Sequence, residues 1–355
     1  MRKKATRTAK TTATRAKKAS TRSSGAAGVR ILLATDGSPG AAVALDLVAA
    51  LPLRSRDEVI VVMYPDYFLA ARPDRTGLIG RLMQGRRDAA LRTVDAAVRQ
   101  LEQRGLRASG VVAEGLEAVD GILRVIAERA PDLLVMGTRG LGPVRSAVIG
   151  SVARALAQLS PVPVLIVRDL RTAPQRVLVA VDGSEASRAA LSALARLPAP
   201  KELTIEILNV MPARDWARMS LPDEHLGQVR ETQERAEAEA ADALLRSSRE
   251  ALPTGVRVRT AKERGAVTET IWAHADAMAA DLIVLGSRGD AGPRRPFWGS
   301  TAERLIVTSG RSVLVAPPPA KRPSRSATTA RAGTGRSSAA SGSHGSRRRR
   351  RTSAR

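Results

Sequence analysis

The segment GTRGLGPVRSAVIGS, residues 137–151, decides the fold predicted for this chain. It follows the apolar run Leu133-Leu134-Val135-Met136 and ends in residues typical of a helix start. Glycine lets a backbone approach an anion closely, and the free N–H groups of a helix start point toward that anion. A strand, a glycine loop and a helix start in this order therefore predict a site for phosphate.

The same arrangement of glycines occurs twice. The first copy has Gly137, Gly140, Gly150 and Ser151, and the second copy, after another apolar run, has Gly286, Gly289, Gly299 and Ser300. The segment 30–38 also returns at 176–184, so that Asp36 and Asp182 are 146 residues apart, while Gly137 and Gly286 are 149 apart. A nearly constant offset over the whole unit indicates an internal duplication of a domain.

Each copy alternates apolar strand patterns with helical patterns. This alternation predicts an α/β fold with two tandem, doubly wound, mostly parallel five-stranded sheets and helices on both faces. Strands are expected at residues 31–34, 59–63, 106–112, 133–136 and 162–167, then at 177–180, 203–210, 256–260, 281–285 and 312–315. Helices are expected at residues 40–50, 86–104, 117–129 and 151–159, then within 224–251 and at 267–279.

Ligands of such sheets bind beyond the carboxyl ends of the strands, where the strand order reverses. Asp36 and Asp182 follow the first strand of each copy, and the glycine loops follow the fourth strand. A second interpretation remains open, in which the glycines serve only tight turns and helix packing, and the aspartates only cap the next helix.

Composition limits the class of protein. With 355 residues, 43% of them hydrophobic and 2% aromatic, the chain can hold two domains whose cores are built from Ala, Val, Leu and Ile. The absence of cysteine excludes disulfides, thiolate metal sites and cysteine nucleophiles. No apolar run approaches the length of a membrane span, and no apolar leader follows Met1. We expect a cytoplasmic protein without membrane contact, with association to the nucleoid as an alternative.

Positive charge is concentrated at the two ends of the chain. Residues 1–28 carry nine Lys and Arg, residues 317–355 carry eleven, and neither segment contains an acid. Of the net charge of +24, only +4 therefore belongs to residues 29–316. We expect both ends to be disordered tails that bind DNA or RNA without sequence preference, because they offer charge but no aromatic stacking platforms.

Both copies resemble domains of the universal stress protein family, over residues 29–169 and 176–316. The resemblance is carried by the Asp-Gly-Ser turn after the first strand and by the Gly-x2-Gly-x9-Gly-Ser motif after the fourth. It implies the strand order 3-2-1-4-5, ATP as ligand, and use of the fifth strand for dimerisation. The two halves are therefore expected to pack as an intrachain pseudo-dimer, and a homodimer is left open.

The resemblance also implies roles for single residues. Asp36 and Asp182 would lie near ribose and phosphate, with Mg²⁺ between them and the nucleotide. Adenine would contact the backbone at Tyr64 and Val210, where Tyr64 departs from the small aliphatic residue usual in the family. The phosphates of one nucleotide would be held by Gly137, Gly140, Gly150 and Ser151, and those of a second by Gly286, Gly289, Gly299 and Ser300.

Catalytic signatures are missing from the sequence. It contains no P-loop, no Gly-x-Gly-x-x-Gly after either first strand and no nucleophile elbow, and its three histidines lack metal-ligand spacing. Since neither motif offers a general base, we expect a non-enzyme with weak ATPase activity at most. Two hypotheses follow: an ATP-binding stress-response regulator, or a nucleoid-associated protein whose tails bind DNA around a structural core.

The tails generate a first prediction. If about six of their charges neutralise phosphates at once, the logarithm of the affinity for duplex DNA should fall with the logarithm of salt concentration at a slope near −5. Removing residues 1–28 and 317–355 should flatten this slope and weaken binding, as measured by fluorescence anisotropy at several salt concentrations. A truncated protein with unchanged affinity and slope would show that the tails are not the binding element.

Overall fold

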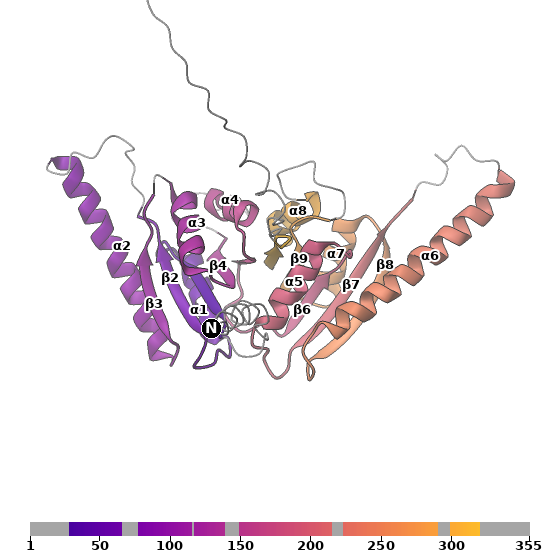
Figure 1. Ribbon diagram of the computed structural model, residues 1–355, viewed down its shortest axis with the longest axis horizontal. Helices are drawn as coiled ribbons and strands as arrows, with labels where there is room; N and C mark the ends of the chain where they lie inside the picture. The colour runs from indigo at the N-terminus through magenta and orange to yellow at the C-terminus, as the bar shows by residue number, and fades with distance from the viewer. Residues whose placement is uncertain are drawn as a thin grey trace, which may run out of the picture. The chain divides into compact units, whose positions relative to one another are not determined.

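The computed structural model describes residues 28–65, 77–115, 117–138, 149–214, 223–289 and 299–319. In these residues the two copies build one ten-stranded sheet, with the order β3-β2-β1-β4-β5-β10-β9-β6-β7-β8 (Figure 1). The order 3-2-1-4-5 predicted for each copy is confirmed, because the second half repeats it in its own strands. Apart from Gly28 and residues 317–319, the predicted tails lie outside the described residues.

The first half alternates strands and helices in chain order, with parallel pairing throughout. Its elements are β1 (Arg30–Ala34), α1 (Pro39–Ala50), β2 (Glu58–Met63), α2 (Leu78–Gln103), β3 (Ala108–Val112), α3 (Ala118–Arg129), β4 (Leu133–Gly137), α4 (Ser151–Leu159) and β5 (Val164–Val167).

The second half repeats this order, again with parallel pairing among its own strands. Its elements are β6 (Arg176–Ala180), α5 (Glu185–Arg196), β7 (Thr204–Pro212), α6 (Asp223–Glu250), β8 (Arg257–Gly265), α7 (Val267–Ala277), β9 (Leu282–Gly286), α8 (Ser300–Thr308) and β10 (Ser312–Ala316).

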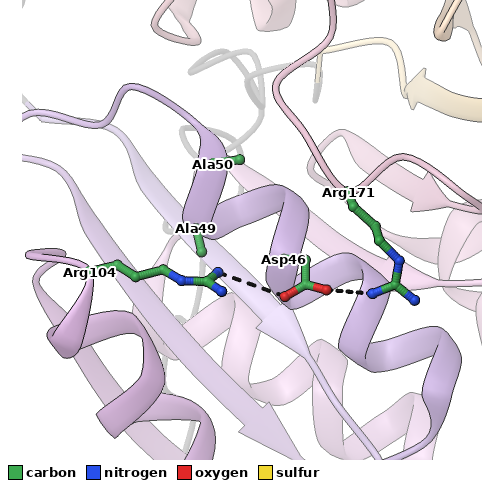
Figure 2. Close-up of a pocket in the computed structure, with 5 residues that line it drawn as sticks. All are labelled: Asp46, Ala49, Ala50, Arg104 and Arg171. Carbon is green, nitrogen blue, oxygen red and sulfur yellow. Dashed lines mark hydrogen bonds and ion pairs between the residues drawn. The ribbon is translucent and has the colours of Figure 1, made fainter.

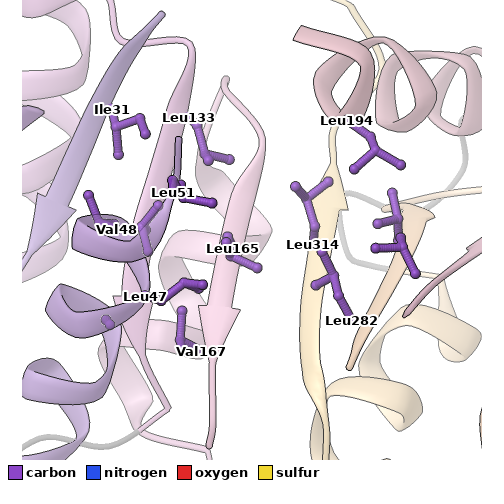
Figure 3. Close-up of a cluster of buried hydrophobic side chains, with 14 of the residues drawn as sticks. Ile31, Leu47, Val48, Leu51, Leu133, Leu165, Val167, Leu194, Leu282 and Leu314 are labelled. Atoms are coloured by element: carbon purple, nitrogen blue, oxygen red, sulfur yellow. The ribbon is translucent and has the colours of Figure 1, made fainter. Parts of the chain in front are cut away.

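Helices cover both faces of the sheet. One buried cluster joins one face to α1, α2, α5 and α6, and a second joins the other face to α3, α4, α7 and α8. Figure 3 shows the first cluster, in which Leu47 of α1 lies near Leu165 and Val167 of β5. The buried members of this cluster are all Ala, Val, Leu or Ile, as the composition of the sequence predicted.

The two halves join through their last strands. β5 and β10 pair antiparallel, with Val313 opposite Ile166, Leu314 opposite Leu165, and Val315 opposite Val164. Val164 and Leu314 are 1% and 0% exposed. The predicted pseudo-dimer is therefore confirmed, and the pairing removes two apolar edges that would otherwise invite association with other strands.

Several predicted boundaries were wrong. The helix expected to begin at residue 86 begins at Leu78. The strand expected at 203–210 continues to Pro212, and the one expected at 256–260 continues to Gly265. Both strands, β7 and β8, are longer than predicted because they remain hydrogen-bonded to each other up to the pair Pro212 and Gly265. The charged sequence Lys262-Glu263-Arg264 concealed the extension.

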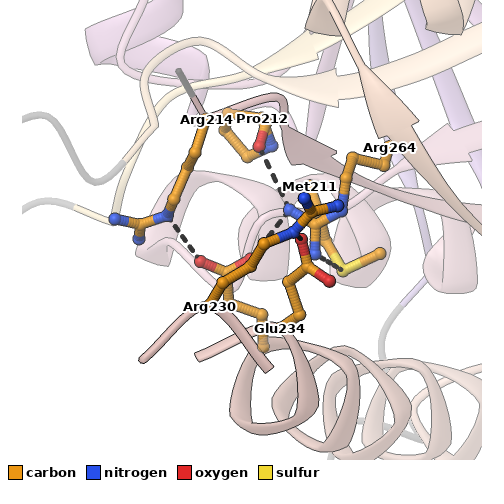
Figure 4. Close-up of polar contacts among 7 residues, drawn as sticks. Met211, Pro212, Arg214, Arg230, Glu234 and Arg264 are labelled. Atoms are coloured by element: carbon orange, nitrogen blue, oxygen red, sulfur yellow. Dashed lines mark hydrogen bonds and ion pairs between the residues drawn. The ribbon is translucent and has the colours of Figure 1, made fainter. Parts of the chain in front are cut away.

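Ion pairs with α6 hold this extension in place. Glu237 accepts hydrogen bonds from Nε of Arg214 at 2.7 Å and pairs with Nη1 of Arg264 at 2.9 Å. Desolvation raises the pKa of Glu237, but the hydrogen bonds from Arg264 and Arg214 outweigh it and hold that pKa below its ordinary value. Arg264 also donates to the carbonyl oxygen of Pro212 and contacts the sulfur of Met211 (Figure 4).

Within the part of the chain that the structure describes, no helix combines the length and apolar character that crossing a membrane requires.

Candidate functional site

The turn after the first strand of each half is built in the same way. Gly37 and Gly183 adopt φ values of 76° and 82°, a left-handed conformation that glycine takes without strain. The N–H of Ser184 donates to Oδ1 of Asp182 at 3.0 Å, and Ser38 and Asp36 form the same bond at 3.0 Å. Each aspartate therefore uses one carboxylate oxygen to shape the turn.

The residue that caps the next helix is the serine. Oγ of Ser38 accepts a hydrogen bond from the N–H of Ala41 at 3.2 Å, and Oγ of Ser184 accepts one from the N–H of Ser187 at 3.1 Å. The alternative in which the aspartates cap α1 and α5 is therefore wrong. Capping falls to the serines, and this leaves Oδ2 of each aspartate outside the cap.

In the second half the turn lies against the glycine loop. A Cβ atom on Gly289 would stand 2.6 Å from Oδ2 of Asp182, so this oxygen lies beside the Gly289 backbone. Oγ of Ser184 also donates to the carbonyl oxygen of Arg288 at 3.2 Å. Because β6 and β9 are neighbours in the sheet, their carboxyl ends bring Asp182 and Gly289 together.

The first glycine of each motif is needed for packing. A Cβ on Gly137 would lie 2.5 Å from the carbonyl carbon and oxygen of Gly40 in α1. A Cβ on Gly286 would lie 2.6 Å from the backbone nitrogen of Ser187 in α5. These contacts involve backbone atoms, which cannot move aside cheaply. The small size of both glycines is therefore required for helix–strand packing, whatever ligand the loop receives.

The last glycine of each motif closes the loop onto its strand. The N–H of Gly150 donates to the carbonyl oxygen of Thr138 at 2.8 Å, and the N–H of Gly299 donates to that of Ser287 at 2.9 Å. Strand end and helix start are thereby adjacent. The loop residues 139–148 and 290–298 lie outside the described residues, and Gly140, Arg139, Asp290, Arg294, Arg295, Phe297 and Trp298 are among them.

The helices that follow the loops begin without a side-chain cap in the part of the chain that the structure describes. Gly150 and Gly299 are the N-cap residues of α4 and α8, and neither helix start shows a side-chain capping bond. The first turns begin with Ser151 and Ser300. An N-terminus with free N–H groups and the positive end of the helix dipole is suited to an anion.

The two positions expected at adenine differ. Tyr64 directly follows β2, and its hydroxyl donates to the carbonyl oxygen of Gly115 at 3.2 Å. Its ring also packs against Gly121 of α3. Val210 instead lies within β7, in register with Glu263 of β8. The backbone at Val210 is thus part of the sheet, while the side chain of Tyr64 ties the end of β2 to α3.

One buried polar residue near the site was missed from sequence. Asn209 is 9% exposed, and its Nδ2 donates to the carbonyl oxygen of Val181 at 2.8 Å, directly before Asp182. It links the carboxyl ends of β7 and β6. An asparagine inside the apolar run Ile207-Leu208-Asn209-Val210 was the available signal, because a buried amide needs hydrogen-bond partners.

A separate hollow of about 420 Å³ contains none of the predicted site residues. It is lined by Asp46, Ala49, Ala50, Arg104 and Arg171 (Figure 2). Asp46 pairs with Nη1 of Arg104 at 3.7 Å and with Nη1 of Arg171. The Asp46 carboxylate thus engages both arginines that line the hollow, and these ion pairs account for the polar residues found there. Across the described residues, no group of three or more acids or histidines is placed to hold a metal ion.

The fold and these strand-end turns define a duplicated α/β protein in which each half repeats the same turn and the same glycine motif. The universal stress protein family model matches residues 29–168 and 174–317, and the chain belongs to this family.

Three relatives illustrate the range of similarity. Universal stress protein Rv2623 of Mycobacterium tuberculosis is 26% identical over 310 residues, covering 83% of this chain and 98% of that protein. The crystal structure of a universal stress protein from Archaeoglobus fulgidus covers 81% of this chain and 98% of its own, with a TM-score of 0.52 and 21% identity. A family member from Arabidopsis thaliana with AMP bound covers 39% of this chain and 91% of its own, with a TM-score of 0.31 and 18% identity.

The glycine geometry generates a second prediction. Replacing Gly286 by Ala should lower the free energy of unfolding by roughly 1–3 kcal/mol, because the new methyl meets the backbone of α5. Replacing Gly289 by Ala should change it by less than about 1 kcal/mol, since the atom that the new methyl meets is the end of the Asp182 side chain and not helix backbone. Urea unfolding measures both. Equal losses in the two variants would contradict the separation of a packing glycine from a site glycine.

Proposed function

We propose that each half binds one adenine nucleotide, as ATP with Mg²⁺, and that the protein acts as a nucleotide-dependent regulator in the stress response. The observation that carries this proposal is the gathering of Asp182, Gly289 and the uncapped start of α8 at the carboxyl ends of neighbouring strands. The first half repeats the same turn and the same uncapped helix start.

The residues present are compatible with a nucleotide phosphate. Gly289 places no side chain between the loop and the Asp182 carboxylate, and the N-cap glycine of α8 leaves the helix start open to an anion. Ser300 and Ser151 add a hydroxyl donor at each helix start. Adenine nucleotides are the proposed class because the chain belongs to a family in which the Arabidopsis thaliana member binds AMP.

A magnesium ion would be held mainly by the nucleotide. One carboxylate in each half, Asp36 or Asp182, has an oxygen beyond the one that shapes its turn. Mg²⁺ is commonly bound by one or two carboxylates together with phosphate oxygens and water. The bound ion would offset the repulsion between this carboxylate and the phosphates.

We also propose that the bound nucleotide is retained largely unhydrolysed. Asp182 is held in its turn by the hydrogen bond from Ser184, and His274 of α7 is engaged with Glu206 of β7. Neither arrangement supplies a group poised to activate water at the helix start. Binding that changes conformation or partner choice is therefore the proposed output. The alternative function in DNA binding concerns the tails and remains a prediction from sequence.

Calorimetric titration of the full chain with ATP and Mg²⁺ tests this proposal. We expect one nucleotide per half, and loss of one site each in Gly140→Val and Gly289→Val, because the side chain blocks close approach of the backbone to phosphate. Gly227→Val on α6 is the matched control, since a Cβ there meets nothing within 4 Å. Undiminished stoichiometry in both loop variants, with folding verified by circular dichroism, would refute the site assignment.

A further inference from the structure

The seam between the halves brings equivalent positions of the duplication face to face. Over residues 137–168 the second copy follows at an offset of 149, so Leu165 corresponds to Leu314. These two residues are partners in the β5–β10 pairing, and the pairs on either side exchange equivalent positions. The register therefore has an approximate twofold axis at Leu165 and Leu314, and any residue near this axis meets its own counterpart.

At one position near the axis, where a residue faces its own counterpart in the other half (a self-facing position), the two halves carry opposite charges. Arg154 is the fourth residue of α4, and Glu303 is the fourth residue of α8, at the same offset of 149. Nη2 of Arg154 and Oε1 of Glu303 form an ion pair across the seam. Two copies of the first half paired in this geometry would bring Arg against Arg, and two copies of the second half would bring Glu against Glu.

Hydrogen bonds at the seam show the same asymmetry. The backbone N–H of Arg168 donates to Oγ of Ser312 at 3.1 Å, and its Nη2 donates to the carbonyl oxygen of Ile306 at 3.4 Å. The counterparts of Arg168 and Ser312 are Pro317 and Pro163. Proline has neither an N–H nor a hydroxyl, so these bonds form only on one side of the axis.

The same bonds are lost when like halves pair. If two first halves paired in this register, the N–H of Arg168 would face Pro163, which offers no hydroxyl. If two second halves paired, Ser312 would face Pro317, which offers no N–H. Only the pairing of unlike halves provides the donor, the acceptor and the complementary charges together. Specificity of this kind combines an attraction for the right partner with a repulsion against the wrong one.

We propose that the seam selects unlike halves. The edge strand of the first half accepts a universal-stress-type domain with an acid at the position of Glu303 and a hydroxyl at the position of Ser312, and it rejects a second first half. The fitting partner is the second half of the same chain. This selection does not depend on nucleotide binding.

Charge reversal in the full chain tests the proposal. Arg154→Glu and Glu303→Arg should each lower the melting temperature by roughly 2–4 °C at low salt, because each creates a like-charge pair at the seam. The double variant R154E/E303R should regain most of the loss. R154Q, which only removes the attraction, should lose less than R154E. Half-molar salt should reduce the losses through screening.

Arg235→Glu is the matched control for charge reversal itself. Arg235 pairs with Glu239 on α6, and these side chains are 81% and 69% exposed, so its reversal should shift the melting temperature by less than about 1 °C. Recovery in the double variant supports selection by charge. Additive losses in R154E/E303R, or equal losses in R154E and R154Q, would overturn the proposal, because the self-facing position would then carry no repulsion.

Discussion

The central strands are buried on both faces, and this burial dictates how they connect. Leu32 and Leu33 are neighbours on β1 whose side chains point to opposite faces, yet each is 0% exposed. Strands of this kind need helices on both faces, and the crossover helices make the strands parallel. All strands of one half therefore end at the same edge, which brings the Asp-Gly-Ser turn and the glycine loop together.

The same constraint explains why the motif glycines divide into separate roles. Gly137 and Gly286 let β4 and β9 approach the first turn of α1 and α5, because any side chain there would meet helix backbone. Gly150 and Gly299 close the loops and start the next helices. Gly289 leaves room beside the Asp182 carboxylate. Packing is therefore the role of Gly137 and Gly286, while the ligand role proposed for the motif falls on its other glycines.

Sequence patterns predicted the alternation of strands and helices well, because the apolar runs and the duplication are both long-range, redundant signals. The strand order 3-2-1-4-5 followed instead from the resemblance to the family. The run Ile31-Leu32-Leu33-Ala34 and its repeat at Val177 to Ala180 identify central strands by burial alone. The extension of β7 and β8 was hidden, since Lys262 and Arg264 form ion pairs with Asp242 and Glu237 of α6, which belong to a different element. Likewise, no local pattern shows that Tyr64 bonds to Gly115 or that Asn209 bonds to Val181.

Amide hydrogen exchange with and without ATP and Mg²⁺ tests whether phosphates bind at the starts of α4 and α8. We expect slower exchange for the backbone N–H groups of Ser151 to Ala153 and of Ser300 to Ala302, because phosphate oxygens would accept hydrogen bonds from them. The start of α1, which Ser38 already caps, should change little. Nucleotide bound at saturation with unchanged exchange at both helix starts would contradict phosphate binding at these starts.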